Sequence, residues 1–277
     1  MTRCAALRVL ALVLWWGATA CAAPEAQPAR GPAADAVRAG IAGGSKAFDP
    51  GRWDALLRAH VDAEGRVDYA GFGKERGSLD AFLAEVARAD LSSLGRPELL
   101  AVLINAYNAC TVRLILDGTR EGRWPASIRD LPDPWGRKLC ALGGETLSLD
   151  TIEHGLLRPL FRDSRIHAAV NCASRSCPPL APWAYRGGHI DEQLRERLES
   201  MIDSDAHVRI DERRLRLSKI FDWYAADFKD PAFLGAAPTI DAYLRRHARP
   251  ERRRAIEALG PSPRIEWLDY DWSLNSR

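Results

Sequence analysis

The sequence predicts an α+β fold with mixed helices around a small, largely antiparallel sheet. Helical periodicity recurs along the chain, and two pairs of short strand-like segments flank turn residues. Helices and strands alternate irregularly, without the repeated strand–helix–strand order of a parallel sheet. Residues 46–277 contain no internal repeat and are numerous enough to bury a substantial core. We therefore expect a single globular domain over residues 46–277.

The first 20 residues have the pattern of a secretory signal peptide. Arg3 and Arg8 precede a continuously apolar run over residues 9–16, and small residues follow over 17–20. The apolar run is shorter than the roughly 20 residues that a membrane-spanning helix needs. We therefore expect export, with residues 1–20 acting as the signal peptide.

Cys21 follows the signal pattern directly. Ala18-Thr19-Ala20-Cys21 resembles a lipoprotein processing site in which Cys21 carries the lipid, although plain cleavage near Ala20 fits the same residues. Residues 21–45 are rich in Ala, Pro and Gly and predict a flexible tether. The expected location is the periplasmic side of the cell envelope, with membrane contact only through the lipid anchor.

The charge balance argues against nucleic acid as a partner. The chain has 39 Lys and Arg residues against 37 Asp and Glu residues, and loss of Arg3 and Arg8 with the signal makes the two numbers equal. A neutral chain lacks the basic surplus that binds a phosphate backbone. The expected partner is an unknown peptide or small-molecule ligand.

The clearest helix opens at Pro97 and ends at Gly118. Proline is tolerated in a first helical turn, and glycine is favoured just after the last one. Its apolar stripe has the spacing of a helix buried along one side, with Asn105 and Asn108 on the flank of that stripe. Amphipathic spacing predicts further helices over residues 53–61, 79–86, 190–202, 219–228, 239–246 and 251–259.

Two hairpins and a closing strand supply the predicted sheet. Gly143-Gly144 separates residues 138–142 from 145–149, which is a hairpin signal. A second hairpin is expected around Asp211-Glu212, between residues 208–210 and 215–217. Residues 265–270 have the composition of a further strand.

Residues 150–171 are expected to form a short helix and then a strand. Asp150-Thr-Ile-Glu153 resembles a capping box, and the helix would end at Pro159. From Ile166 to Asn171, aliphatic residues alternate with other residues, a period-2 pattern that predicts a strand.

The predicted strand delivers Cys172 at its exit. A thiol becomes a nucleophile when a neighbour lowers its pKa or accepts its proton. His154 and His167 are the available bases, and Asn105 or Asn108 is expected to orient one of them or to bind an oxyanion. Each Asn has an alternative role in bridging backbone groups.

Three further residues complete the expected site as substrate-binding groups. Arg158 lies one helical turn after His154 and is suited to hold an anionic group or to favour a thiolate. Ser174 lies two residues beyond Cys172. Glu153 adjoins His154, although its capping-box position gives it an alternative role in helix capping.

Other arrangements of the cysteines remain open. In an oxidising compartment Cys172 and Cys177 are disulfide candidates, and buried inert thiols are a further alternative. A metal site formed with His154 and His167 matches no standard zinc spacing, so no metal and no cofactor are expected. Cys110 and Cys140 are expected to be core residues, with a disulfide between them as an alternative.

Five motifs together resemble the domain of unknown function 547 family. They are Asn105-Ala-Tyr-Asn108, Ile152-Glu-His154-Gly-Leu-Leu-Arg158, Arg165-Ile-His167 through Asn171-Cys-Ala-Ser174 to Cys177-Pro-Pro-Leu180, Phe221-Asp-Trp-Tyr224 with Asp227-Phe228, and Tyr270-Asp-Trp-Ser-Leu-Asn275. Bacterial members are frequently exported, which is what the resemblance implies here. It implies no activity, and its polar motif positions coincide with the candidate site residues.

The functional expectation is a cell-envelope hydrolase or acyl transferase of cysteine type, acting on peptide or amide bonds. Cys, His and Asn on a helix-plus-sheet core are similar in kind to papain-like and transglutaminase-like hydrolases, although here the histidines precede Cys172 in the chain. The alternative is a non-catalytic envelope module that binds a ligand and is stiffened by a Cys172–Cys177 disulfide.

Overall fold

The structure, a computed structural model, describes residues 27–211 and 213–277. The signal peptide expected over residues 1–20 and the expected lipidation site at Cys21 lie outside the described residues. The α+β prediction is confirmed: helices dominate, and the strands form one sheet of two strands and one of three. The helices of the described residues are α1 Pro32–Gly43, α2 Gly51–His60, α3 Tyr69–Lys74, α4 Arg76–Arg88, α5 Arg96–Asp117, α6 Arg158–Phe161, α7 Ile190–Asp203, α8 Ile220–Trp223, α9 Ala225–Lys229, α10 Ile240–His247 and α11 Pro250–Glu257.

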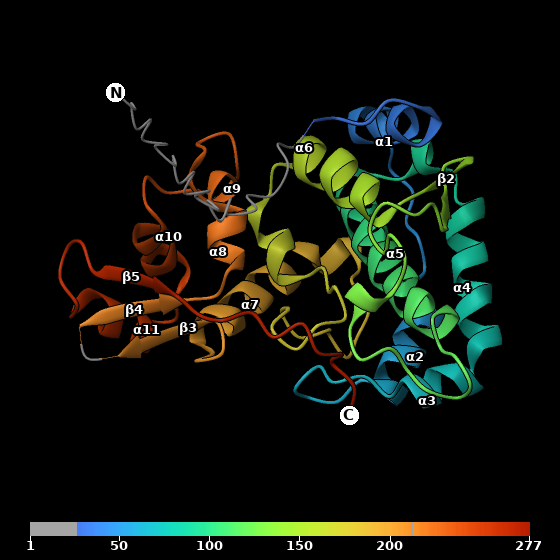
Figure 1. Cartoon of the computed structure of the whole chain (residues 1–277). Coiled ribbons are helices and arrows are strands. Elements are labelled where there is room, and N and C mark those ends of the chain that lie inside the picture. The colour runs from blue at the N-terminus through green and yellow to red at the C-terminus, as the bar shows by residue number, and fades with distance from the viewer. Residues whose placement is uncertain (1–26, 212) are drawn as a thin grey trace, which may run out of the picture.

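Both predicted hairpins and the closing strand are confirmed. Strands β1 (Cys140–Leu142) and β2 (Glu145–Leu147) pair antiparallel around the two glycines. In the second sheet β3 (Val208–Asp211) pairs antiparallel with β4 (Arg214–Leu217), which pairs in parallel with β5 (Arg264–Trp267). Figure 1 shows this sheet on one side of the molecule, with α10 and α11 nearby, while α1 to α4 lie on the other side.

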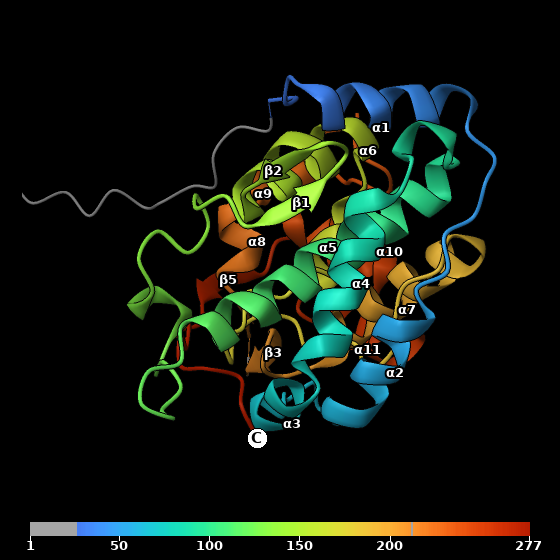
Figure 2. The same ribbon diagram turned by 90° about the vertical axis from the view of Figure 1, so that its right-hand side faces the viewer.

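Helix α5, rather than a sheet, occupies the centre of the larger half. Pro97 lies in its first turn as predicted, and almost every residue from Leu99 to Leu116 is buried. The helix is long and apolar enough to cross a membrane, yet it is the buried core helix of this fold. Figure 2 shows α4 running in front of it and α1 crossing above.

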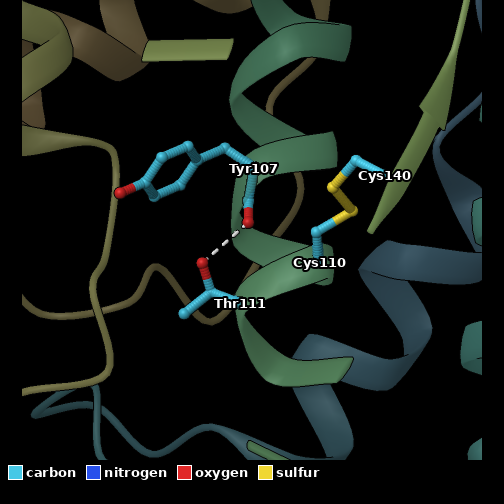
Figure 3. Close-up of a disulfide and its surroundings, with 4 residues drawn as sticks. All are labelled: Tyr107, Cys110, Thr111 and Cys140. Atoms are coloured by element: carbon cyan, nitrogen blue, oxygen red, sulfur yellow. Dashed lines mark hydrogen bonds between the residues drawn. A yellow bond between two sulfur atoms is a disulfide. The ribbon is translucent and has the colours of Figure 1, made fainter. Parts of the chain in front are cut away.

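A disulfide between Cys110 and Cys140 joins α5 to β1, with the two Cα atoms 6.0 Å apart. Both cysteines are buried, as expected, and the alternative of a bond between them is the one that the structure contains. Figure 3 shows that the Tyr107 side chain, one turn earlier on α5, leaves the helix on a different side from Cys110. One helix thus anchors the small hairpin with one face and presents Tyr107 with another.

The flexible tether expected over residues 21–45 is wrong for its second half. Residues 32–43 form α1, in which Pro32 occupies the first turn and Ala33, Ala34 and Val37 are buried against the core. The small residues that suggested a linker instead permit close packing. The oxygens of Leu91 and Leu94 lie so close to Gly40 that a Cβ there would clash with both.

The predictions for residues 150–171 need two corrections. Residues 151–157 form a π-helix, η3 (Thr151–Leu157), that continues into α6, so the helix passes through Pro159 and the capping box is not formed. The strand predicted over 166–171 is wrong: Ser164–Ala168 is a 3-10 helix, η4, followed by irregular backbone. His167 is as buried as Ile166, so the alternation in sequence does not separate an inner from an outer face.

Two buried clusters make up the core. The first core surrounds α5 and includes side chains of α1, α2 and α4. The second core contains side chains from α7, the β3–β4 hairpin and helices α8 to α11. After β5 the chain runs back beside the first core, where the Tyr69 hydroxyl donates to the Asn275 side-chain oxygen over 2.7 Å and the backbone of Ser276 bridges to Val67.

Candidate functional site

A pocket of about 340 Å³ is lined by residues from both cores. One side carries polar groups from η3, η4 and the loop over residues 172–177, which we call the thiol loop. The adjoining part of the lining, which we call the aromatic wall, is formed by Ile220, Trp223, Tyr224, Tyr270 and Trp272. Glu153, His154, His167, Cys172 and Cys177 all line this pocket, so five of the expected site residues share one cavity.

Hydrogen bonds from the Asn171 side chain and from the chain around Ser273 hold the thiol loop in place. Asn171 accepts from the Ala173 N–H over 2.9 Å and donates to the Pro178 carbonyl over 2.8 Å. The chain near its C-terminal end supports the outer side, where Arg175 N–H donates to the Ser273 carbonyl. Ala173 has a φ of 61°, a left-handed conformation that costs a non-glycine residue roughly 1 kcal/mol or more. The left-handed backbone of Ala173 bends the chain directly after Cys172.

Cys172 and Cys177 are free thiols with their sulfur atoms 3.0 Å apart, so the expected disulfide candidate is not bonded in this structure. Cys172 is half-buried and Cys177 is buried. The Cys172 N–H also donates to the Cys177 sulfur over 2.9 Å. The two side chains are therefore adjacent but differ in their access to the pocket.

The surroundings of Cys172 favour its thiolate. The hydroxyls of Ser174 and Tyr270 lie 3.2 and 3.4 Å from its sulfur. Hydrogen bonding from Cys177 is the largest influence and outweighs burial, and together with these hydroxyls it lowers the pKa of Cys172 to about 7. Burial raises the pKa of Cys177 well above its ordinary value, and its contact with Cys172 acts in the same direction.

The histidines do not bond to Cys172, contrary to the expected thiol–imidazole pair. The Cys172 sulfur has hydrogen-bonding contacts with Cys177, Ser174 and Tyr270, and within the described ranges no histidine is among its partners. The expectation rested on the predicted strand, which would have set His167 and Cys172 along one straight segment. The 3-10 turn at residues 164–168 directs His167 elsewhere.

His167 belongs instead to a buried charged network. Its Nε2 lies 2.8 Å from Oδ2 of Asp227 on α9, and Arg158 donates to both oxygens of that carboxylate over 2.7 and 2.9 Å. Burial would raise the pKa of Asp227, but hydrogen bonds from His167 and Arg158 lower it to about 2. The His167 ring stacks on Tyr224 at 3.9 Å between centroids. The imidazole is thus held firmly from two sides.

Two polar atoms in this network face each other without partners. Oε1 of Glu153 and Nδ1 of His167 are 4.0 Å apart, and neither has a hydrogen-bond partner among the residues that the structure describes. Both side chains are at least nine-tenths buried and both line the pocket. Unpaired buried polar atoms are costly, so their presence at a pocket wall is a functional signal.

His154 occupies the outer part of the same wall. Its Nδ1 lies 3.0 Å from Arg158, and its Nε2 lies 3.8 Å from an oxygen of Asp150. His154 lies on the π-helix η3, and Asp150 and Arg158 flank that helix at its two ends. A π-helix is an uncommon element that occurs frequently at functional sites.

Both asparagine side chains bridge backbone groups, which is the alternative role expected for them. Asn105 donates to the carbonyl and accepts from the N–H of Tyr185. Asn108 donates to the Ala169 carbonyl and accepts from the Asn171 N–H. Each amide spans two backbone groups and fixes an irregular segment against α5. Neither side chain lines the pocket.

Arg158 and Ser174, both expected to bind substrate, do not line the pocket. Arg158 is 2% exposed and its guanidinium is bonded to Asp227, so it positions that carboxylate rather than an anionic ligand. Ser174 is buried beside the thiol, with its hydroxyl 3.0 Å from that of Tyr270. Of the three expected substrate-binding residues, Glu153 alone reaches the pocket.

Sequence reasoning assigned no role to Asp227, Tyr224 or Tyr270. Asp227 is 60 residues from His167, and Tyr270 is 98 residues from Cys172, so spacing gives no hint of either contact. The only signal for them lies in the motifs Phe221-Asp-Trp-Tyr224, Asp227-Phe228 and Tyr270-Asp-Trp-Ser-Leu-Asn275, which carry part of the family resemblance.

Fold and site together define an α+β protein with a two-thiol pocket backed by a buried Arg–Asp–His network. Residues 91–202 match the model of the family described as "Protein of unknown function, DUF547", which agrees with the resemblance carried by the sequence motifs. No curated protein and no solved structure matches the chain significantly. The matched segment contains the thiol loop and the π-helix but not the aromatic wall.

Proposed function

We propose that this pocket is the active site of a thiol-dependent enzyme, a hydrolase or acyl transferase acting on peptide or amide bonds, with Cys172 as nucleophile. The observation that supports it most directly is the position of the Cys172 sulfur in the pocket, among groups that stabilise its thiolate. A thiol with a pKa of about 7 is substantially ionised at neutral pH, so attack does not depend on a histidine in direct contact.

The other pocket groups suit the remaining steps of acyl transfer. Tyr270 is kept protonated, because burial and the nearby thiol charges raise its pKa well above the ordinary value. Its hydroxyl beside Cys172 is therefore a hydrogen-bond donor to charge at the reacting sulfur. His167, oriented by Asp227, lines the same cavity and is suited to move a proton to or from water there.

The lining narrows the substrate class. The aromatic wall offers an apolar surface, while the charged group of the pocket nearest to His167 is the carboxylate of Glu153. Arg158 is committed to Asp227 and does not line the cavity. We therefore expect a neutral or cationic substrate with an apolar or aromatic acyl group, and weaker binding of an anionic one.

Acyl trapping tests the proposal. Reduced full-length protein is incubated with an aryl thioester of a neutral aromatic acid and with a carboxylated analogue, and then digested with trypsin. The neutral probe should acylate peptide 166–175, which holds Cys172, faster than its carboxylated analogue does. The Cys172→Ser variant should lose this adduct, and the matched Cys177→Ala variant should keep it but form it more slowly, because the hydrogen bond from Cys177 that favours the thiolate is lost. If iodoacetamide alkylates Cys172 but no acyl adduct forms there, the acyl-transfer proposal is wrong.

One observation favours a second candidate, a binding module that carries out no reaction. The unpartnered Glu153 Oε1 and His167 Nδ1 offer an acceptor and a second polar atom to one ligand group. In that case Glu153→Gln should weaken ligand binding, measured by calorimetry, while Cys172→Ser leaves it unchanged. An enzyme would show the loss of turnover in Cys172→Ser instead.

The proposed setting is the cell envelope. The signal pattern over residues 1–20 and Cys21 support export and a lipid anchor on the periplasmic side. Mass spectrometry of the N-terminal peptide from the native host tests the anchor, which is contradicted if Cys21 is present without acyl groups.

A further inference from the structure

We infer that Cys172 and Cys177 are a redox-active dithiol that exchanges disulfides with a sulfur-containing substrate in the pocket, Cys172 attacking and Cys177 resolving. The inference rests on the proposed nucleophilic role of Cys172, but it does not depend on acyl chemistry. It assigns a second activity to the same pocket.

The geometry needed for a disulfide is nearly complete. The two sulfur atoms are 3.0 Å apart, and a disulfide bond of about 2.05 Å requires an approach of only about 1 Å. Four residues separate the cysteines, and the loop that carries them is fixed at both ends by Asn171 and by the segment around Ser273. Cys172 can therefore meet Cys177 without rearrangement of the core.

The two thiols differ as the two partners of an exchange reaction must. Both thiols line the pocket, but Cys172 is half-buried whereas Cys177 is only 7% exposed. An incoming disulfide therefore meets Cys172 first. The hydrogen bonds around Cys172 favour the attacking thiolate, and burial keeps Cys177 protonated until a mixed disulfide forms.

The reaction balances with a disulfide substrate as the oxidant. The Cys172 thiolate attacks one sulfur of R–S–S–R′, the S–S bond of the substrate breaks, and R′S⁻ leaves and takes a proton from solvent. Cys177 then attacks the Cys172 sulfur of the mixed disulfide, and RS⁻ leaves with the proton of Cys177. The substrate gains two electrons and the protein pair loses two. A small dithiol donor restores the reduced pair by the reverse steps.

The second cysteine pair provides a contrast within the same molecule. Cys110 and Cys140 are each 2% exposed and are already joined across α5 and β1. Neither of them lines the pocket that contains Cys172 and Cys177. A reagent that enters the pocket should therefore oxidise or reduce the thiol loop and leave the Cys110–Cys140 bond intact.

Peptide mapping after glutathione equilibration tests the inference. Full-length protein is held at several ratios of reduced to oxidised glutathione, quenched in acid, blocked with N-ethylmaleimide and digested. Trypsin cleaves after Arg175, between the two cysteines, so a Cys172–Cys177 bond appears as linked peptides 166–175 and 176–186. We expect the linked pair at oxidising ratios and its loss at reducing ratios.

Two matched variants assign the roles. Cys177→Ser should accumulate glutathione on Cys172, about tenfold more than the wild-type protein does, because no thiol resolves the mixed disulfide. Cys172→Ser should accumulate little glutathione on Cys177. Circular dichroism and the intact Cys110–Cys140 peptide pair verify that each variant is folded.

Three results would overturn the inference: no linked pair at any ratio, a linked pair that millimolar reduced glutathione does not open, or equal glutathione uptake in both variants. The acyl-trapping result is independent of all three. An acyl adduct without glutathione exchange contradicts the dithiol alone, and exchange without an acyl adduct contradicts the acyl-transfer proposal alone.

Discussion

Removing the disulfide between α5 and β1 should weaken the fold by a calculable amount. The bond closes a segment of 30 residues. In the chain-entropy description, a crosslink over such a segment lowers the free energy of the folded state relative to the unfolded state by about 3.6 kcal/mol at 25 °C. Cys110→Ala/Cys140→Ala should therefore lower the free energy of unfolding by about 3–4 kcal/mol. The midpoint of thermal unfolding should fall by about 7–14 °C.

Urea denaturation monitored by tryptophan fluorescence measures this change. The single variants Cys110→Ala and Cys140→Ala are the controls, since either one breaks the same bond. Each should therefore lose about as much stability as the double variant, and the three losses should not add. A loss below about 1 kcal/mol in the double variant would refute the assignment of the bond as a structural crosslink.

Three further perturbations have expected outcomes. Asp227→Asn should lower the free energy of unfolding by about 3–5 kcal/mol in urea denaturation, because it removes the carboxylate that neutralises buried Arg158. An unchanged urea midpoint would contradict the buried Arg158–Asp227–His167 network. Burial lowers the pKa of His207 to about 4, so the free energy of unfolding should fall by about 3 kcal/mol as the pH falls from about 6.5 to 4. The His207→Gln variant should show a flatter dependence of that free energy on pH. Asn108→Ala leaves the Ala169 carbonyl and the Asn171 N–H without their partner and should lower the free energy of unfolding by about 2–4 kcal/mol. Full stability together with an unchanged rate of Cys172 alkylation would show that Asn108 does not hold the thiol loop.

The elements that the sequence predicts correctly depend on local signals. Pro97 and Gly118 mark the ends of α5, and Gly143-Gly144 marks the first hairpin turn, since each needs only its own backbone conformation. The segment 166–171 has no such signal. All six of its side chains are buried, so the alternation does not mark two faces of a strand, and the backbone there is fixed by Asn108 rather than by a neighbouring strand.

The site is predictable only in its composition. Residues close together in the chain, from Glu153 to Cys177, lead to the correct cavity. The contacts within the cavity depend on the second core, because Asp227 and Tyr270 approach from helices and loops that follow residue 219. No local pattern fixes the packing of one core against the other, so the pairing of His167 with Asp227 instead of Cys172 requires the structure.

The division of the pocket between two parts of the chain affects how such a protein can diversify. The reactive thiols lie within residues 91–202, whereas the aromatic wall comes from residues 220–272. A substitution of Trp223 on α8 therefore alters the shape that a ligand meets and leaves in place the hydrogen bonds from residues 270–273 to the thiol loop. Evolution can exchange one ligand for another on the α8 side of this wall while the chemistry stays in place, and an engineer seeking new specificity would begin at Trp223.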